Sequence, residues 1–453
     1  MKFYGGRPIR LVMACSLALA LSGCGGDSIP ISVSVGGTVT GLAGTGLVLQ
    51  NNLGSDLPIA ANGSFVFPTQ LTSGQSYNVT IKSQPRLGAV QCQVSGGSGV
   101  AVAQAVTSVA INCAPPTPSL LLVSRATSNS VEILRIDSGT GGLQHLGSKS
   151  LAAGATPVYV AVGPSMQFAY VANAGDKSIA IFRVDEAAGT LTEVGVPVST
   201  ADAPDFISFD PTGRFAYVSH SGVGKVSVFQ VDATTGALTP TTGSPFSTGS
   251  GSRSLQVAPS GTVAYAMAST GINVYTVDPA TGALAIASSV TTAGGSPSFA
   301  IDPGNRYVYA PYYDISWTPP DDIGAFAVTD AASGALAPIS GSPFKTGAGG
   351  ANWAAVDPTG RYLYVVGFSL TVASHAIDPA TGALTQLNTN VSDASPSYVL
   401  ADPSGRYVYV ANDHGSLSAY SIGVSGALTP VGAPLQLPAY GPYGSMSIAL
   451  VTQ

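Results

Sequence analysis

Charged residues are scarce in this chain of 453 residues, since Asp, Glu, Lys and Arg together make up only 9% of it. An average soluble domain contains roughly 25%. The 17 Lys and Arg residues are outnumbered by 23 Asp and Glu residues, which gives a formal net charge of −6. Nucleic-acid binding needs a clustered basic surface, so the composition argues against a nucleic-acid partner.

Uninterrupted stretches long enough for helices are also missing. The chain holds 55 Gly and 32 Pro residues, and these interrupt it too often for long helices. Short apolar runs rich in Val, Tyr and Phe lie between the interruptions and are typical of strands. The sequence therefore predicts an all-β protein.

The first apolar run, Leu11 to Leu21, is too short to span a bilayer. Basic residues precede it, and it ends in the segment Leu21-Ser22-Gly23-Cys24. This arrangement is typical of a lipoprotein signal peptide over residues 1–23, with Cys24 as the site of lipid attachment. The alternative is an ordinary signal peptide with an incidental cysteine. On the first interpretation the protein is exported and lipid-anchored in the cell envelope, and Gly25 favours the outer membrane.

Only four cysteines are present. Cys15 lies in the signal peptide and Cys24 would carry lipid, which leaves Cys92 and Cys113. An oxidising compartment makes that pair a candidate structural disulfide. Further soft ligands are lacking nearby, which argues against a metal site. No metal cluster and no phosphate-binding glycine loop is recognisable elsewhere, so we expect neither a metal nor a cofactor.

Composition divides the rest of the chain. Residues 24–30 form a polar tether, and residues 31–114 contain about seven short strand signals, as in a small antiparallel Ig-like β-sandwich. Within that segment Asn62-Gly63 is a strong hairpin signal. Residues 115–118 are a proline-rich linker, and residues 119–453 are repetitive.

Two signatures recur in the repetitive part. One is a Gly-x-Leu turn, found seven times between Gly141 and Leu428 at a period of about 47 residues. The other is Asp-Pro-x-Gly-Arg followed by an aromatic strand, clearest at residues 210–214, 357–361 and 402–406. Each unit holds four strands, which is the size of a propeller blade. The pattern predicts a seven-bladed β-propeller.

The phase of the repeats predicts how the ring closes. The first unit, from Leu120, lacks the strand that precedes the Pro-Gly turn elsewhere, and Met446 to Val451 is a strand of the missing type. We therefore expect this C-terminal strand to complete the first blade as its innermost strand. With strands named A to D from the axis outward, both recurrent turns (A–B and C–D) lie on one face. The B–C loops and D–A crossings lie on the opposite, irregular face, where function is expected.

These repeats resemble the lactonase family of seven-bladed propellers, which includes 6-phosphogluconolactonase and carboxymuconate cyclase relatives. Catalytic members carry a Pro-Arg-His motif on one D–A crossing, and Ser252-Arg253-Ser254 stands at the matching place. Asp205 matches a second histidine, Lys225 matches a basic residue, and Ser269 matches a carboxylate. The resemblance thus implies the fold but leaves open whether the propeller is an enzyme.

Lactone hydrolysis needs a base to activate water and cations to hold the developing oxyanion. Arg253 and Lys225 can supply the positive charge, and Asp205 is the candidate base. Because both histidines of the motif are absent, we favour a membrane-anchored propeller that binds a small molecule, glycan or protein on its irregular face. The alternative is an extracytoplasmic lactone hydrolase or cycloisomerase. We expect a monomer in either case.

Further candidate ligand-binding residues lie on the irregular face. They comprise two histidines of B–C loops, three aromatic residues of the longest B–C insertion (residues 311–322), and residues of two D–A crossings: His220, His414, Tyr312, Tyr313, Trp317, Asn352, Trp353 and Tyr443. Aromatic loops suit carbohydrate or protein recognition. A self-packed loop is an equally good interpretation of the insertion, and Trp353 is equally suited to packing between blades.

Overall fold

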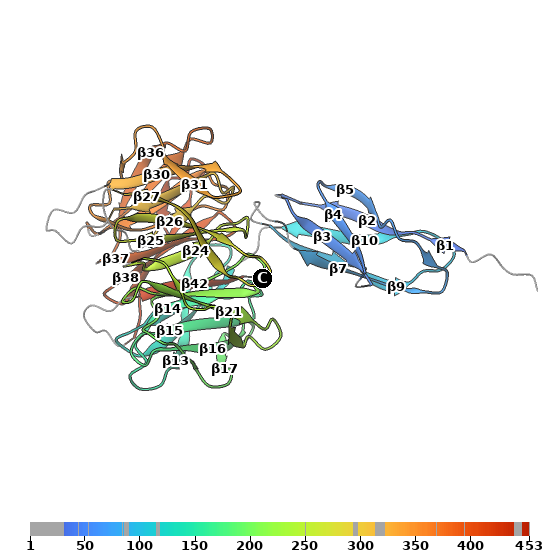
Figure 1. Ribbon diagram of the computed structural model, residues 1–453, viewed down its shortest axis with the longest axis horizontal. Helices are drawn as coiled ribbons and strands as arrows, with labels where there is room; N and C mark the ends of the chain where they lie inside the picture. The colour runs from blue at the N-terminus through green and yellow to red at the C-terminus, as the bar shows by residue number, and fades with distance from the viewer. Residues whose placement is uncertain are drawn as a thin grey trace, which may run out of the picture.

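The structure is a computed structural model that describes residues 31–43, 45–52, 54–83, 85, 90–114, 118–249, 251–292, 298–312, 322–367, 369–393, 395–438 and 446–452. Its regular elements in this part are strands, as the sequence predicts. No helix with the length and apolar character needed to cross a bilayer occurs among these residues. Figure 1 shows a broad body of strands β11 to β42 beside an elongated unit of strands β1 to β10.

The elongated unit has two four-stranded sheets, ordered β5-β2-β10-β8 and β4-β3-β7-β9, and a short pair β1-β6. Its strands are β1 (Ser32–Val33), β2 (Val35–Thr40), β3 (Leu47–Asn51), β4 (Ser55–Ile59), β5 (Gly63–Val66), β6 (Leu71–Thr72), β7 (Ser76–Ser83), β8 (Gln91–Ser95), β9 (Ser98–Val100) and β10 (Val106–Ala114). Apolar residues of both sheets form one core, including Val35, Leu49 and Ile111.

Two features of this unit bear on the sequence predictions. Cys92 of β8 lies opposite Cys113 of β10 in the antiparallel register, and the two form the predicted disulfide. The expectation of a wholly antiparallel sandwich is wrong, because β10 pairs with β2 in parallel. These two strands come from opposite ends of the unit's sequence, so a long connection is available to join them in parallel.

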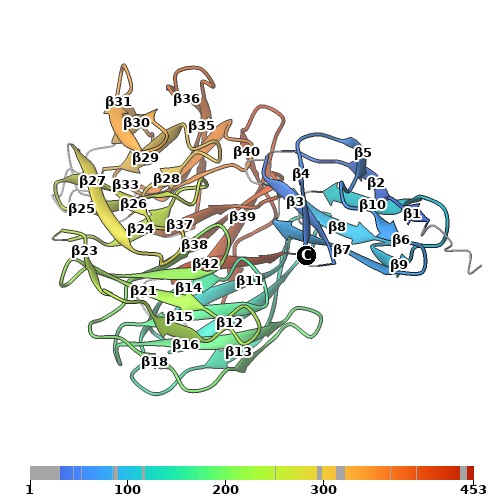
Figure 2. The same ribbon diagram turned by 45° about the vertical axis from the view of Figure 1, so that its right-hand side comes forward.

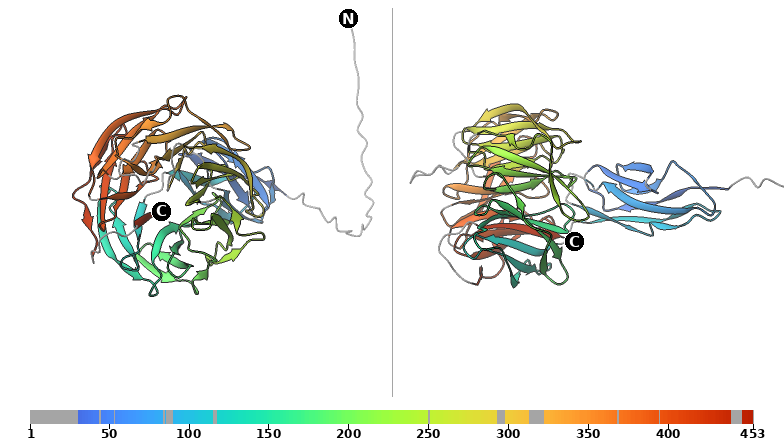
Figure 3. Two further views of the ribbon diagram at one scale, coloured as in Figure 1. Left: turned by 60° about the vertical axis from the view of Figure 1, so that its left-hand side comes forward. Right: turned by 60° about the horizontal axis from the view of Figure 1, so that its bottom comes forward.

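The large body consists, in its described part, of seven sheets arranged around an axis (Figure 3, left), which confirms the seven-bladed propeller. Named from the axis outward, blade 1 has β42 (Met446–Thr452), β11 (Pro118–Arg125), β12 (Ser130–Ile136) and β13 (Leu143–Ser150). Blade 2 has β14 (Pro157–Val162), β15 (Phe168–Asn173), β16 (Ser178–Asp185), β17 (Thr190–Glu193) and β18 (Val198–Ser199). Blade 3 has β19 (Phe206–Phe209), β20 (Phe215–His220), β21 (Lys225–Val231), β22 (Leu238–Pro240) and β23 (Phe246–Ser247).

The remaining blades repeat the order. Blade 4 has β24 (Ser254–Val257), β25 (Val263–Ala268), β26 (Gly271–Val277) and β27 (Leu284–Thr291). Blade 5 has β28 (Ala300–Ile301), β29 (Tyr307–Pro311), β30 (Asp322–Asp330), β31 (Ala335–Pro338) and β32 (Phe344–Lys345). Blade 6 has β33 (Ala351–Val356), β34 (Tyr362–Gly367), β35 (Thr371–Ile377) and β36 (Leu384–Val391). Blade 7 has β37 (Pro396–Ala401), β38 (Tyr407–Asn412), β39 (Ser416–Ile422), β40 (Leu428–Pro430) and β41 (Leu435–Gln436).

Blade 1 is built from both ends of the propeller sequence. Strand β42 pairs with β11 in an antiparallel register that places Val451 opposite Leu120, as the phase of the repeats predicts. Figure 2 shows β42 beside β11 and β14 at the centre of the molecule. All seven residues of β42 are buried. The pairing of β42 with β11, here called the seam, therefore removes the free edge that β11 would otherwise expose.

The two recurrent turns meet in a repeated contact between blades. At five of the seven junctions, the aromatic residue that opens a B strand packs over the glycine of the C–D turn in the next blade. Val263 takes this place against Gly334, and Leu146 of β13 contacts Gly189. At Gly236, one of the five, a Cβ atom would lie 2.5 Å from a ring carbon of Phe168, and its φ of +75° also favours glycine. Further along the same strand, the hydroxyl of Tyr170 donates a hydrogen bond to the Gly236 carbonyl at 3.0 Å.

This contact also closes the ring. The ring of Tyr407 from blade 7 packs against Gly141 of blade 1, and its hydroxyl donates to the Gly139 carbonyl at 2.7 Å. Arginines of the A–B turns stack over the same aromatic rings, as with Arg406 at 5.3 Å from the Tyr407 ring centroid. The turn-bearing face is thus a ring of interblade contacts, in which the arginines serve structure.

Some backbone groups on the inner edges of the A strands bond to side chains of neighbouring A strands. The Ser208 hydroxyl of blade 3 donates to the Leu255 carbonyl of blade 4 at 2.6 Å. In the same direction around the axis, the Gln256 amide of blade 4 donates to the Phe299 carbonyl at 2.8 Å. An exposed edge of backbone groups normally invites pairing with another strand. These side chains instead use the groups to link consecutive blades.

Candidate functional site

A cavity of about 400 Å³ lies on the propeller axis, between the innermost strands. Its lining runs from Tyr159 and Phe206 at one end to Phe209 at the other, and it includes Val356. Phe209 and Val356 are the last residues of β19 and β33, which lead into the A–B turns. The cavity therefore extends towards the turn-bearing face. Its volume is in the range of small-molecule sites.

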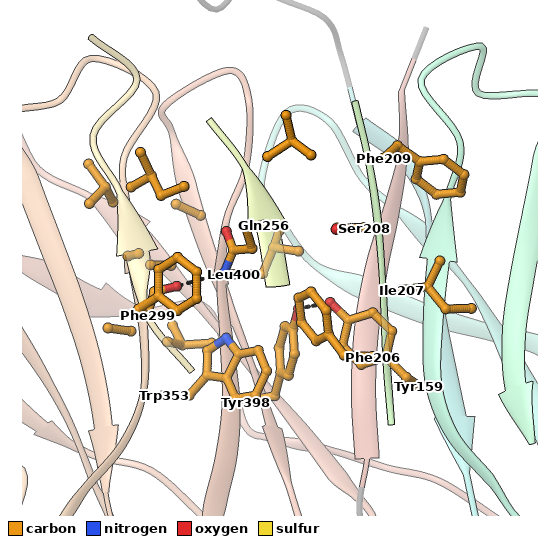
Figure 4. A pocket seen from close by; sticks show the side chains of 18 residues that line it. Tyr159, Phe206, Ile207, Ser208, Phe209, Gln256, Phe299, Trp353, Tyr398 and Leu400 are labelled. Carbon is orange, nitrogen blue, oxygen red and sulfur yellow. Dashed lines mark hydrogen bonds between the residues drawn. The ribbon is translucent and has the colours of Figure 1, made fainter. Parts of the chain in front are cut away.

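Aromatic rings from four blades form the floor of this cavity (Figure 4). The ring centroids of Trp353 and Tyr398 are 4.2 Å apart, and those of Tyr159 and Phe206 are 4.4 Å apart. Phe206 and Trp353, from blades 3 and 6, approach to 6.2 Å. The hydroxyls of Tyr159 and Tyr398 form a hydrogen bond of 3.0 Å. Burial raises the pKa of Tyr398 to about 12, so this pair stays neutral at physiological pH.

This floor separates the cavity from the irregular face, where the sequence places the site. Arg253 immediately precedes β24, and Lys225 is the first residue of β21. Both side chains are exposed, and no described residue forms an ion pair with either. The structure therefore brings these two cations to the same face in consecutive blades.

Buried hydroxyl groups flank Arg253 on both sides. The hydroxyls of Ser252 and Ser254 have no hydrogen-bond partner in the described part of the chain, and the same holds for Thr248 earlier on the crossing. All three residues are fully buried. Buried polar groups in proteins almost always have a partner, so a water molecule or a ligand oxygen is the natural complement here.

His220 is not available to a ligand, which corrects the prediction that it binds one. It ends strand β20 and is only 2% exposed. One ring nitrogen lies 3.2 Å from the Ala203 carbonyl and the other 2.8 Å from the Ser227 hydroxyl. Burial lowers the pKa of His220, against smaller opposing effects of the Ala203 carbonyl and the Asp205 charge. His220 is therefore a neutral, buried residue of β20 that connects the crossing before β19 to strand β21.

Asp205 lies near His220, just before β19. Its carboxylate accepts a hydrogen bond from the Ser221 backbone N–H at 2.5 Å, and its side chain is half-buried. The carboxylate thus fixes the B–C loop of blade 3. One lone pair of a candidate base is already used by this contact.

Tyr312 is packed inwards, although the sequence analysis predicts it as a ligand-binding residue of the irregular face. It is 4% exposed, and a Cβ atom at Gly324 would lie 2.2 Å from its hydroxyl. The ring therefore fills the space that Gly324 leaves on β30. Tyr313, Trp317 and Tyr443 lie outside the described residues, as does Cys24.

The other predicted residues have separate environments. Trp353 lines the axial cavity, whereas its neighbour Asn352 accepts a hydrogen bond from the Ser298 hydroxyl through its carbonyl, at 3.2 Å. His414 lies in the B–C loop of blade 7 and is half-buried. Beside it, burial raises the pKa of Asp413. Within the described residues, no group of three or more His, Cys, Asp or Glu side chains is placed to hold a metal ion.

The sequence analysis missed the partners of Trp353 in the floor. Phe206, Tyr159 and Tyr398 come from A strands at least 45 residues apart along the chain, one repeat or more, so no local pattern connects them. The available signal was the phase of the repeats. It places an aromatic residue early in the A strands of four blades.

Comparison with known proteins agrees with this fold. The sequence profile described as "Lactonase, 7-bladed beta-propeller" matches residues 153–253 and 316–445, about half of the chain. A search of the curated proteins finds no match.

Solved structures are similar over the propeller. A putative 6-phosphogluconolactonase from Bacteroides fragilis is 18% identical with a TM-score of 0.62, over 73% of this chain and 98% of its own. A protein from Lactobacillus plantarum is 21% identical with a TM-score of 0.61, over 74% and 99%. The periplasmic gluconolactonase of Pseudomonas aeruginosa is 23% identical with a TM-score of 0.59, over 74% and 99%. At these identities the likeness supports the fold alone.

Proposed function

The chain belongs to the lactonase family of seven-bladed β-propellers, and on that basis we propose that it is an exported propeller that binds a small anionic ligand on its irregular face. The observation that carries the proposal is the pair of exposed cations, Arg253 and Lys225, beside buried hydroxyls that lack a described partner. A guanidinium and an ammonium group suit a carboxylate or phosphate. The hydroxyls of Ser252 and Ser254 supply further polar partners if the crossing shifts slightly.

Binding without turnover is favoured by the state of the candidate bases. The nitrogens of His220 are both engaged inside blade 3, and the Asp205 carboxylate holds a backbone N–H. A general base must be within reach of the proton it removes and must be free to accept it. His220 and Asp205 meet this requirement poorly.

Lactone hydrolysis is the second candidate. Family membership favours it, together with the gluconolactonase names of two structural neighbours. In this reaction Arg253 and Lys225 would stabilise the oxyanion and Asp205 would activate water. Both candidates use the same cations, so a single set of variants tests them.

The experiment measures heat of binding and turnover in parallel. Gluconate and 6-phosphogluconate are titrated calorimetrically into the purified protein, and hydrolysis of the corresponding lactones is followed by acid release. We expect the acids to bind without lactone turnover above background, and Arg253→Ala and Lys225→Ala each to weaken binding on the order of tenfold. Lys149→Ala, on the outer strand β13, is the matched control and should bind normally.

Each other outcome changes the assignment. Turnover that disappears in Arg253→Ala establishes the lactonase instead. If no ligand binds, or if the Lys149→Ala control weakens binding as much as the other two variants, the proposed site is wrong.

The placement of the protein is also a proposal. We propose that Cys24 carries a lipid anchor that holds the protein at the outer membrane, and that residues 31–114 act as an Ig-like spacer before a propeller of residues 119–453. The chain enters the propeller from this unit at the turn-bearing end of β11, so the irregular face is directed away from it. Mass spectrometry of the first peptide tests the anchor. An unmodified Cys24 in envelope preparations would contradict it.

A further inference from the structure

The axial cavity is separate from the cations Arg253 and Lys225, neither of which lines it. We infer that it takes a small, uncharged, planar ring compound that carries a hydrogen-bond donor and an acceptor. The inference rests on the charge, shape and polar groups of the cavity lining. It does not depend on the proposed function, because the aromatic floor lies between the two sites.

The absence of charge in the lining selects a neutral ligand. None of the residues that line the cavity is acidic, basic or histidine. Moving a charged group from water into such a site is unfavourable unless an opposite charge compensates it. An anion of the kind proposed for the irregular face is therefore disfavoured here.

The shape of the floor selects a ring. Trp353 and Tyr398 are nearly stacked, with an interplanar angle of 30°. Phe299 stands as a side wall above them in Figure 4. Offset and edge contacts between aromatic rings add stabilisation beyond that of the area they bury. A planar ring can use both surfaces at once.

Two side-chain polar atoms in the lining remain available, in addition to the backbone groups of the A strands. No described residue accepts a hydrogen bond from the Trp353 indole N–H, and Figure 4 shows its nitrogen on the ring edge that faces Gln256 and Phe299. The amide nitrogen of Gln256 is used by the Phe299 carbonyl, which leaves its oxygen as an acceptor. The Ser208 hydroxyl already donates to the Leu255 carbonyl. A sugar with four or more hydroxyls would leave most of them without side-chain partners, so a planar ring with one donor and one acceptor fits better.

The test uses benzamide, which is neutral and planar with both a donor and an acceptor. Its matched probes are benzoate, the isosteric anion, and methyl glucoside, a neutral polyol. The chain has only two tryptophans, so in the full-length Trp317→Phe protein the fluorescence reports Trp353 alone. We expect a saturable change with benzamide, and affinities for benzoate and methyl glucoside that are lower by on the order of tenfold.

Variants locate the binding. Leu400→Phe, which narrows the cavity, should weaken benzamide binding on the order of tenfold, and Gln256→Leu should weaken it on the order of fivefold. Arg253→Ala, on the other face, should leave it unchanged. The inference is overturned if benzoate or methyl glucoside binds as well as benzamide, if no change saturates, or if Leu400→Phe binds normally. The comparison of probes on the Trp317→Phe protein stands even if a cavity variant fails to fold.

Discussion

The two faces of the propeller differ in how their polar groups are used. On the turn-bearing face, buried aspartates accept backbone N–H groups of their own turns, as Asp357 does from Tyr362 at 2.7 Å. The hydroxyls of Tyr170, Tyr217 and Tyr309 then bridge to the next blade, whereas the equivalent hydroxyls of Tyr265, Tyr364 and Tyr409 have no partner among the described residues. On the irregular face, the described crossing around Arg253 has buried hydroxyls without partners and exposed cations. The comparison indicates that stability is concentrated on one face, which leaves the other free to vary.

The irregular face also differs from blade to blade. The last residue of the B strand is a buried polar residue in blades 2, 3 and 7, namely Asn173, His220 and Asn412. Each bonds a serine of the C strand in its own blade. In blades 4 and 6 the same position is Ala268 and Gly367. The repeat therefore fixes the fold at this point but leaves its chemistry open.

The strongest test of the comparison removes a carboxylate from each face. Asp402→Ala deprives the buried Tyr407 N–H, 3.0 Å away, of its acceptor, so we expect it to lower the free energy of unfolding by about 2–3 kcal/mol. Asp205→Ala, on the irregular face, should cost less than about 1 kcal/mol because the site is half-buried. Urea denaturation measures both. Equal losses would remove the distinction between the faces.

A matched pair of tyrosines sharpens the comparison within the turn-bearing face. The Tyr309 hydroxyl donates to the Gly382 carbonyl at 2.9 Å, whereas the equivalent Tyr265 hydroxyl has no partner in the described part of the chain. We expect Tyr309→Phe to cost about 1 kcal/mol and Tyr265→Phe to be neutral or stabilising. Thermal unfolding of the two variants checks this. A larger loss from Tyr265→Phe would mean that the bridge does not stabilise the ring.

The buried histidine gives a pH-dependent test on the irregular face. Burial lowers the pKa of His220 below that of the unfolded chain, about 6.5. As the pH falls through 6.5, the unfolded chain takes up a proton that the folded protein does not, so the free energy of unfolding decreases. The slope is at most about 1.4 kcal/mol per pH unit.

His220→Asn should fold, because asparagine occupies this position in blades 2 and 7. We expect it to lose the decrease below pH 6.5 that the unmodified protein shows. Denaturation at several pH values between 5 and 8 measures the difference, roughly over the range in which histidine titrates. Parallel profiles for the two proteins would contradict a buried, neutral His220.

The smallest expected changes in stability come from two arginine variants, one on each face. Arg253→Ala should change the free energy of unfolding by less than about 0.5 kcal/mol, since its side chain is exposed. Arg406→Ala, which removes the stacking on Tyr407, should cost about 0.5–1 kcal/mol. Binding of gluconate should follow the opposite order. If the Arg406→Ala protein folds but no longer binds gluconate, the binding site lies on the turn-bearing face and the proposed site is wrong.

The repeats made the fold predictable because both signatures belong to one contact. A glycine such as Gly236 is required where the Phe168 ring leaves no room for a Cβ atom, so the contact is visible in the sequence. The disulfide was predictable by elimination among four cysteines, and the Sγ atoms of Cys92 and Cys113 are bonded in the structure. The site was less predictable. His220 was assigned to a loop, yet β20 extends through it, and that single residue decides its burial.

Strand β42 follows β11 by more than three hundred residues, yet the two share one sheet. During synthesis, blades 2 to 7 can each assemble as they emerge from the ribosome, whereas blade 1 waits for its inner strand. A chain truncated by a premature stop or cut before Met446 keeps an open, apolar edge on β11. Such a chain is a natural substrate for chaperones and proteases. The seam therefore distinguishes finished molecules from incomplete ones.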